Sequence, residues 1–296
     1  MVPITIGVPV FNGAETLDES LACLARQTFR DFRALIFDNA STDATSDIAR
    51  AWAARDSRFE HRRQPENVGV VGNFRAALLA ADTPWFMWRA DDDLSADDYV
   101  ETLYRLAMAS PGCKLAVGRV VSADSDGRPL RLTEAPDKLD PASIVGRLRT
   151  LFAYHPSWFY GLWEREALVD AYLPVCENFP FAYAADHLTL YGPIIDGAVR
   201  TTAKAEFVQR ARRTTARTRM RFALMLEARL AFHRELRRIR AQRDIPMGFH
   251  AALIAIEPFY LERTVPTLVK TARTGLRELL GLAGQNKVGR HFERTR

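Results

Sequence analysis

The first half of the chain alternates short apolar runs with amphipathic stretches, and no other feature constrains the fold as strongly. The apolar runs are residues 4–10, 32–37 and 85–89, and residues 59–63 are expected to form a weaker third strand between the last two of them. The stretch 15–27 places leucines three and four residues apart, which predicts one apolar face of a helix. Strands that alternate with helices in this way form parallel sheets covered by helices on both faces. The sequence therefore predicts an α/β protein.

The second half gives weaker signals. We expect a strand over 157–162, helices over 163–171 and 185–195, and a long Arg-rich helix over 218–243. Prolines interrupt the apolar segments that follow this last helix.

The composition excludes several classes of protein. A chain of 296 residues that is 48% apolar can bury a substantial core, so a disordered protein is excluded. Three scattered cysteines do not form a disulfide framework or a zinc site. The chain opens on an apolar strand without the charged region of a signal peptide, and no apolar run is long enough to span a membrane. We expect a cytoplasmic protein.

The net charge of +5 is divided unevenly along the chain. Residues 1–199 carry 19 Lys and Arg against 28 Asp and Glu, a net charge of −9. Residues 200–296 carry 22 against 8, a net charge of +14. An acidic part and a basic part predict a basic region that meets an anionic partner, for which nucleic acid, phospholipid and a diphosphate-bearing substrate are all candidates.

Three adjacent acids, Asp91 to Asp93, follow directly on the fourth apolar run. Open parallel sheets bind ligands at the carboxyl ends of their strands, where Asp38 also falls. Adjacent carboxylates repel one another, and Mg²⁺ or Mn²⁺ compensates such charge by binding one or two carboxylates together with phosphate oxygens. The alternative is that Asp92 and Asp93 are solvated loop acids, one of which caps the helix that begins near Ala96.

Several motifs occur in a characteristic order and spacing. They are Pro9-Val-Phe11-Asn12-Gly13, Gln27-Thr28-Phe29, Phe37-Asp38-Asn39-Ala40-Ser41-Thr42-Asp43, Asn67-Val68-Gly69 and Ala90-Asp91-Asp92-Asp93. Over residues 3–110 the chain thus resembles the family 2 inverting glycosyltransferases with the GT-A fold. The resemblance implies a Rossmann-like, mostly parallel sheet flanked by helices. It also implies a GT-A catalytic domain over 1–215, with a nucleotide-binding half to residue 110 and an acceptor half beyond it, followed by a basic helical region over 216–296.

The resemblance also implies roles for individual residues. Pro9, Phe11 and Asn12 would line the nucleotide site, and Asp38 would accept a hydrogen bond from the base. Asn67 and Asn73 would contact the nucleotide. Asp91 would lie near the ribose, and Asp92 and Asp93 would bind the metal. As alternatives, Asp38 is a turn or capping acid and the two asparagines are turn or capping residues. The family has an acid where this chain has Ala90, which leaves the division of labour among the three aspartates open.

An inverting transfer needs a general base, which in the family is an acid on a helix of the second half. Asp186 is our candidate, and Glu177 and Asp196 are weaker ones. The alternative is that Asp186 caps the helix that follows it. His187 contacts the acceptor or, as we favour, is an ordinary partly buried histidine.

Many relatives carry a histidine after the base, in a segment whose place is taken here by residues 209–215. Arg212 stands where that histidine would be. Arginine does not ligate a metal but neutralises a diphosphate through two parallel hydrogen bonds. A divalent cation, Mg²⁺ or Mn²⁺, is therefore expected, and whether the reaction requires it stays open.

The leading hypothesis is an inverting transferase that moves a sugar from a nucleoside diphosphate, with UDP favoured, to a glycan or lipid-linked acceptor in cell-surface polysaccharide or glycolipid synthesis. A nucleotidyltransferase and, less well supported, a basic nucleic-acid-binding protein are the alternatives, so nucleic acid is not an expected partner. The Arg-rich helix is a solvated face, a contact with anionic lipid at the inner face of the membrane, or a contact between copies in a homo-oligomer.

Overall fold

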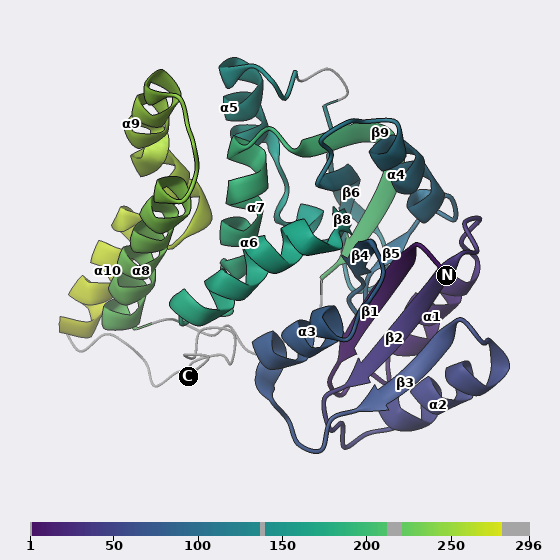
Figure 1. Cartoon of the computed structure of the whole chain (residues 1–296). Coiled ribbons are helices and arrows are strands. Elements are labelled where there is room, and N and C mark those ends of the chain that lie inside the picture. The colour runs from purple at the N-terminus through teal and green to yellow at the C-terminus, as the bar shows by residue number, and fades with distance from the viewer. Residues whose placement is uncertain (1, 137–139, 212–220, 280–296) are drawn as a thin grey trace.

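The structure is a computed structural model, and it describes residues 2–136, 140–211 and 221–279. Within these residues nine strands form one mixed sheet in the order β3-β2-β1-β4-β8-β6-β9-β5, with β7 paired to β6 (Figure 1). The strands are β1 Ile4–Val10, β2 Phe32–Asp38, β3 Phe59–Arg63, β4 Trp85–Trp88, β5 Leu94–Ser95, β6 Leu115–Ala123, β7 Pro129–Thr133, β8 Leu162–Glu164 and β9 Val199–Arg210. The predicted α/β class is confirmed.

Strands β1 to β4 are parallel, and helices cover both faces of this part of the sheet. Alternate residues of β2 point to opposite faces. Ala34 and Ile36 join the main core together with Leu21 of α1, whereas Leu35 packs with Ala77 of α3. The helices of this half are α1 Leu17–Ala25, α2 Thr45–Arg55, α3 Gly69–Leu79 and α4 Tyr99–Met108. The continuous apolar runs are therefore strands that are buried on both sides.

One prediction in the second half is wrong. Residues 157–162 do not form a strand, because a 3₁₀ helix occupies Pro156–Tyr160 and β8 begins at Leu162. Pro156 has its φ fixed and lacks an N–H, which suits the first position of a helix. The His155 side chain caps this turn by accepting a hydrogen bond from Ser157 N at 3.1 Å.

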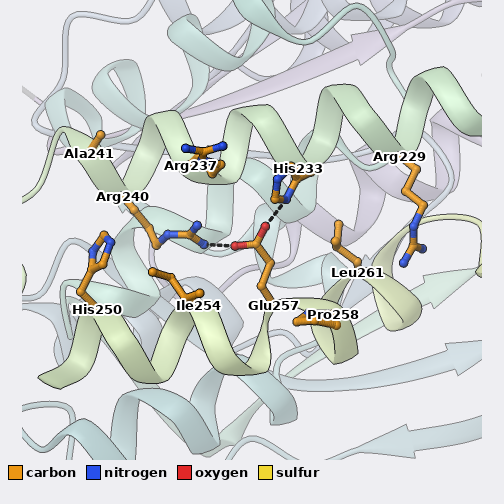
Figure 2. A pocket seen from close by; sticks show the side chains of 10 residues that line it. All are labelled: Arg229, His233, Arg237, Arg240, Ala241, His250, Ile254, Glu257, Pro258 and Leu261. Atoms are coloured by element: carbon orange, nitrogen blue, oxygen red, sulfur yellow. Dashed lines mark hydrogen bonds and ion pairs between the residues drawn. The ribbon is translucent and has the colours of Figure 1, made fainter.

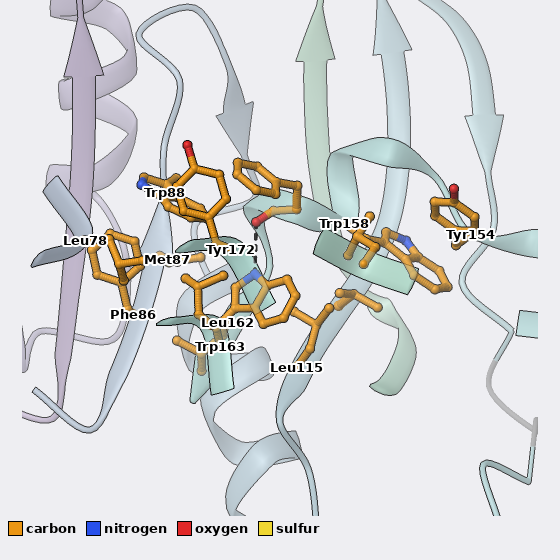
Figure 3. Close-up of a cluster of buried hydrophobic side chains, with 14 of the residues drawn as sticks. Leu78, Phe86, Met87, Trp88, Leu115, Tyr154, Trp158, Leu162, Trp163 and Tyr172 are labelled. Atoms are coloured by element: carbon orange, nitrogen blue, oxygen red, sulfur yellow. Dashed lines mark hydrogen bonds between the residues drawn. The ribbon is translucent and has the colours of Figure 1, made fainter. Parts of the chain in front are cut away.

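A cluster of aromatic side chains joins the two halves of the sheet (Figure 3). Trp88 of β4 stacks on Phe159 with ring centroids 4.3 Å apart, and Tyr172 of α6 meets Trp88 edge to face. Trp163 of β8 donates its indole N–H to the Phe159 carbonyl at 3.0 Å. One core therefore extends from the strands of the first half into the second half.

The helices after residue 140 are α5 Ile144–Ala153, α6 Arg165–Asn178, α7 Ala185–Ile195, α8 Phe222–Ala241, α9 Met247–Thr264 and α10 Leu268–Leu279. The last three form the helical C-terminal region, in which α8 packs against α7 and α10 (Figure 1). Arg263 of α9 donates to the Tyr154 carbonyl at 2.8 Å, at the end of α5. Among the helices described, none is both long enough and apolar enough to cross a bilayer.

Candidate active site

The carboxyl ends of β1, β2 and β4 meet at one edge of the sheet. Val10 pairs with Asp38 in the parallel register, and Arg89, which follows β4, donates its N–H to the Gly7 carbonyl at 2.9 Å. A cavity of about 250 Å³ opens at this edge. It is lined by Asn12, Gly13, Glu15, Thr16, Asp91, Asp92, Ser125, Asp126, Arg210 and Ala211.

The turn after β1 must approach the acidic triplet closely, and a glycine permits this. A Cβ atom on Gly13 would lie 2.2 Å from Asp91 Oδ2 and 2.6 Å from Val10 Cγ2. On the other side, the Ser20 hydroxyl lies 3.1 Å from the carbonyl oxygens of Ala90 and Asp93. The backbone around the triplet is thus fixed by α1 and by the β1 turn.

Arginine side chains compensate part of the charge of the triplet. Arg89 is fully buried and donates Nη2 to Ser95 Oγ at 2.8 Å. Burial, followed by the charges of Asp92 and Asp91, raises the pKa of Asp93 to about 7, against the opposing Arg210 amide and the Arg89 guanidinium. The Arg89 guanidinium and the Arg210 amide therefore offset part of the charge of the triplet, and a bound divalent cation stays a prediction.

The three aspartates do not face the same way. Asp93 Oδ1 accepts the Arg210 backbone N–H at 3.0 Å, and Asp93 does not line the cavity. Asp91 and Asp92 line it. Asp91 and Asp92 therefore face the cavity, whereas Asp93, which the resemblance assigned to the metal, bonds to β9.

Arg210 is the site residue that the sequence did not single out. It ends β9, whose Val208 pairs with Leu94 of β5 directly after the triplet. Its Nη1 lies 2.5 Å from Glu19 Oε2, and its side chain is only 10% exposed. Its Nη2 is buried without a hydrogen-bond partner among the residues that the structure describes. The predicted arginine, Arg212, lies outside the described residues.

The predicted nucleotide contacts at the end of β1 differ in accessibility. Asn12 is exposed and lines the cavity, and it accepts the Thr42 N–H at 2.8 Å. Pro9 is buried and Phe11 is partly exposed, and neither lines the cavity. Their roles beside the base stay predictions.

The two predicted asparagines hold the backbone. Asn73 is buried and donates to the Phe37 carbonyl at 2.8 Å. Asn67 accepts from Asn39 Nδ2 at 2.9 Å and from the Gly69 N–H at 2.9 Å. These contacts fit the turn-forming alternative, and a contact with a nucleotide stays a prediction. Asn39 is the residue that ties the end of β2 to this loop.

Asp38 is fully buried and already has several partners. It accepts the Ser41 N–H at 2.8 Å, the Arg63 Nη1–H at 2.7 Å and the Ser46 hydroxyl. Burial raises its pKa, but the hydrogen bonds from Ser41, Ser46 and Arg63 outweigh burial and lower the pKa of Asp38 to about 2. A base that bonds to this carboxylate requires one of these partners to move, so base recognition by Asp38 stays a prediction.

The lowered pKa makes Asp38 a source of acid sensitivity. A pKa that falls from 3.8 to about 2 on folding corresponds to roughly 2 kcal/mol in the free energy of unfolding. Because the folded-state pKa is the lower one, this contribution is complete above about pH 5 and is lost as the pH falls from about 4 toward 2. Urea unfolding of the wild type and of Asp38→Asn should therefore differ more at pH 7 than at pH 3, and an equal difference at both pH values would contradict the assignment.

Asp186 lies in the first turn of α7, where it is partly exposed and accepts the His187 N–H at 2.8 Å. The partly exposed Tyr160 ends the 3₁₀ helix that packs against α7. Burial, and then the charges of Asp93, Asp186 and the other two triplet carboxylates, raise the pKa of the Tyr160 hydroxyl well above its usual value. The fold therefore brings Asp186 into the electrostatic neighbourhood of the triplet, although the two are far apart in the sequence.

His187 belongs to a hydrogen-bonded chain rather than to the cavity. Its Nδ1 contacts the Tyr154 hydroxyl, which lies 2.7 Å from the Tyr260 hydroxyl of α9. Burial lowers the pKa of His187. This arrangement agrees with the favoured interpretation of an ordinary, partly buried histidine, and it links the helix of Asp186 to the C-terminal region.

Acids and an arginine thus meet at the carboxyl ends of the strands, which is where open α/β sheets bind their ligands. The family model described as glycosyl transferase family 2 matches residues 5–165, which is more than half of the chain. The chain belongs to glycosyl transferase family 2. This membership favours the leading hypothesis over the nucleotidyltransferase and nucleic-acid-binding alternatives.

Individual known proteins agree with this membership. Glycosyltransferase GlyA of Streptococcus pneumoniae serotype 4 is 30% identical over 102 residues, which are 34% of this chain and 14% of GlyA. This chain thus spans a small part of the length of that relative. The crystal structure of S. aureus TarS 1-349 in complex with UDP-GlcNAc superposes with a TM-score of 0.65 at 16% identity, over 93% of this chain and 75% of that one.

A second solved structure shows the same fold. The mannosyltransferase PcManGT from Pyrobaculum calidifontis, in complex with GDP-Man and Mn²⁺, superposes with a TM-score of 0.54 at 18% identity. The superposition covers 95% of this chain and 76% of the PcManGT chain. These likenesses confirm the GT-A fold.

Proposed function

We propose that this glycosyltransferase moves a sugar from a nucleoside-diphosphate donor to an acceptor hydroxyl with inversion at the anomeric carbon. The observation that carries the proposal is the cavity that Asp91, Asp92 and Arg210 line together. Arg210 donates its Nε–H to the Asp92 carbonyl, and its buried Nη2 has no partner among the described residues. A diphosphate supplies the acceptor oxygens that this guanidinium lacks. UDP is the favoured nucleotide, and the UDP-GlcNAc complex of TarS supports this choice.

The carboxylates of the cavity suit a divalent cation. Within the described ranges no three His, Cys, Asp or Glu residues are grouped to hold a metal ion. Mg²⁺ and Mn²⁺ commonly take only one or two carboxylates and fill their other positions with water and substrate phosphate. Asp92, with Asp91 beside it, would hold such an ion. When bound, the ion stabilises the charge of the leaving diphosphate, and the Mn²⁺ of PcManGT supports its inclusion.

Asp186 takes the proton from the acceptor hydroxyl in this proposal. An inverting transfer places the acceptor on the face of the sugar opposite the leaving diphosphate, so the base must lie across from the donor cavity. Asp186 meets two requirements, because it is partly exposed and lies near Tyr160 and the triplet without lining the donor cavity. Arg210 stabilises the diphosphate as its negative charge grows.

The acceptor is a glycan or a lipid-linked glycan, and the enzyme acts in cell-surface polysaccharide or glycolipid synthesis at the cytoplasmic side of the membrane. The net charge of +14 over residues 200–296 supports a peripheral contact with anionic lipid. A homo-oligomer stays an open proposal.

Calorimetry with UDP-, GDP-, dTDP- and CMP-sugars, with and without Mn²⁺, tests the donor. We expect one nucleotide, UDP first among them, to bind more tightly when Mn²⁺ is present. Failure of every nucleotide to bind in either condition would sink the proposal.

Replacing Arg210 with Gln should weaken donor binding by about tenfold to a hundredfold, because a charge-assisted pair with a phosphate contributes about 1.5–3 kcal/mol. Arg105→Gln is a matched control, since Arg105 is exposed and forms an ion pair with Glu101 on its own helix. Titration of both variants with UDP by calorimetry checks the prediction. Equal affinity of Arg210→Gln and the control would remove Arg210 from the donor site.

A further inference from the structure

A second and larger cavity, of about 550 Å³, lies between α8 and α9 and shares no residue with the donor cavity (Figure 2). Its lining is Arg229, His233, Arg237, Arg240, Ala241, His250, Ile254, Glu257, Pro258 and Leu261. Three arginines and two histidines thus face one carboxylate. A volume of this size is typical of sites for small ligands.

The single carboxylate is already engaged. Glu257 is buried and contacts both Arg240 Nη1 and His233 Nδ1, as Figure 2 shows. The guanidinium of Arg229, another lining residue, is also engaged, because its Nη2 lies 2.6 Å from Glu262 and its Nη1 donates to the Pro266 carbonyl at 3.2 Å. These ion pairs fix the walls of the cavity.

Basic donors remain after these pairs are made. Arg240 is 5% exposed, and its buried Nε has no hydrogen-bond partner among the described residues. The side chains of Arg237 and His250 form no ion pair or hydrogen bond with any residue that the structure describes. A buried guanidinium N–H without an acceptor costs free energy, and an anion in the cavity would relieve this cost.

The rim of the cavity is apolar. Ile254 is 52% exposed, Pro258 is exposed, and the buried Leu261 completes the apolar part of the lining. Phe259, next to Pro258, is 70% exposed. A small hydrophilic anion does not use such a rim, whereas a ligand that joins an anionic group to an acyl chain uses both parts.

We propose that this cavity binds the phosphate group of an anionic phospholipid, with the guanidinium groups of Arg237 and Arg240 on the phosphate and the rim at Ile254 against the acyl chain. Arginine matches the geometry of phosphate oxygens and forms parallel hydrogen bonds to them. The site is separate from the donor cavity, so the proposal does not depend on the identity of the sugar. It would seat α8 and α9 against a lipid surface.

Calorimetry of the full chain with soluble, short-chain phosphatidic acid and with inorganic phosphate tests the proposal. We expect phosphatidic acid to bind more tightly than inorganic phosphate. Arg237→Gln should weaken phosphatidic acid by about tenfold, the loss of one charge-assisted contact. Arg234→Gln is the matched control, because Arg234 is exposed on the same helix and does not line the cavity.

A second variant separates the two halves of the ligand. Ile254→Ser should weaken phosphatidic acid and leave inorganic phosphate unchanged. Inorganic phosphate that binds as tightly as phosphatidic acid would overturn the lipid assignment, and equal losses in Arg237→Gln and Arg234→Gln would show general surface charge instead of a site. Displacement of the lipid by an acidic peptide at equal concentration would overturn the assignment to a phosphate.

Discussion

Replacing Asp186 with Asn is expected to lower kcat by about a thousandfold while donor binding stays unchanged, since a positioned general base contributes about 10²–10⁴-fold. The amide has nearly the shape of the carboxylate but does not accept a proton. Asp186 does not line the donor cavity, so its loss should not disturb the diphosphate contacts. The effect is therefore expected in kcat and not in the dissociation constant of the donor.

Glu177→Gln and Asp196→Asn are matched controls and also test the rival candidates for the base. Both residues are exposed, and Asp196 is already paired with Arg243 at 3.0 Å. Initial rates with a saturating donor, together with calorimetry of UDP binding, separate catalysis from binding. Retained turnover in Asp186→Asn, with a loss in either control, would move the role of the base to that residue.

Asp92→Asn is expected to lower kcat/KM by about a hundredfold or more, because it removes charge stabilisation at the leaving group. The loss should be partly recovered at high Mn²⁺ concentration, since the amide oxygen is a weaker ligand in the same place. Rates measured across a series of Mn²⁺ concentrations check both statements.

Asp98→Asn is the control for this second prediction. Asp98 is exposed at the start of α4, and its side chain forms no capping hydrogen bond. This variant removes the same charge close to the triplet without entering the cavity. A loss in Asp98→Asn as large as that in Asp92→Asn would attribute the effect to the net charge of the region rather than to a ligand of the diphosphate site.

Three strands of the first half, β1, β2 and β4, could be predicted because they are buried on both faces. Ile4–Val10 and Phe59–Arg63 have the predicted bounds, and the carboxyl end of β4 leads to the triplet as expected. Continuous apolar runs of this length, separated by turn residues, fit few other structures.

The second half was harder to predict because its strands are half-buried. β9, Val199–Arg210, carries Lys204 and Glu206 among small polar residues, so it lacks both a continuous apolar run and a clean alternation. It is a strand because it pairs with β6 and β5, a long-range effect that no local pattern encodes.

Some of the candidate site residues could be predicted from the sequence and others could not, for the same reason as the strands. Asp91 and Asp92 follow from the sequence, because the end of a parallel strand fixes where they lie. The position of Arg210 could not be predicted from the sequence, because it depends on how β9 pairs with Leu94 of β5. The burial of Arg89 could not be predicted either. A single arginine after an apolar strand gives no indication of whether its side chain is buried or exposed.

The anomalous X-ray signal of Mn²⁺ in a crystal of the protein grown with UDP and Mn²⁺ tests the central claim most directly. The cavity at the ends of β1 and β4 predicts one peak beside the Asp92 carboxylate, with the diphosphate between that peak and the Arg210 guanidinium. A nucleotide bound elsewhere, or in this cavity without any contact to Asp92 or Arg210, would contradict the account.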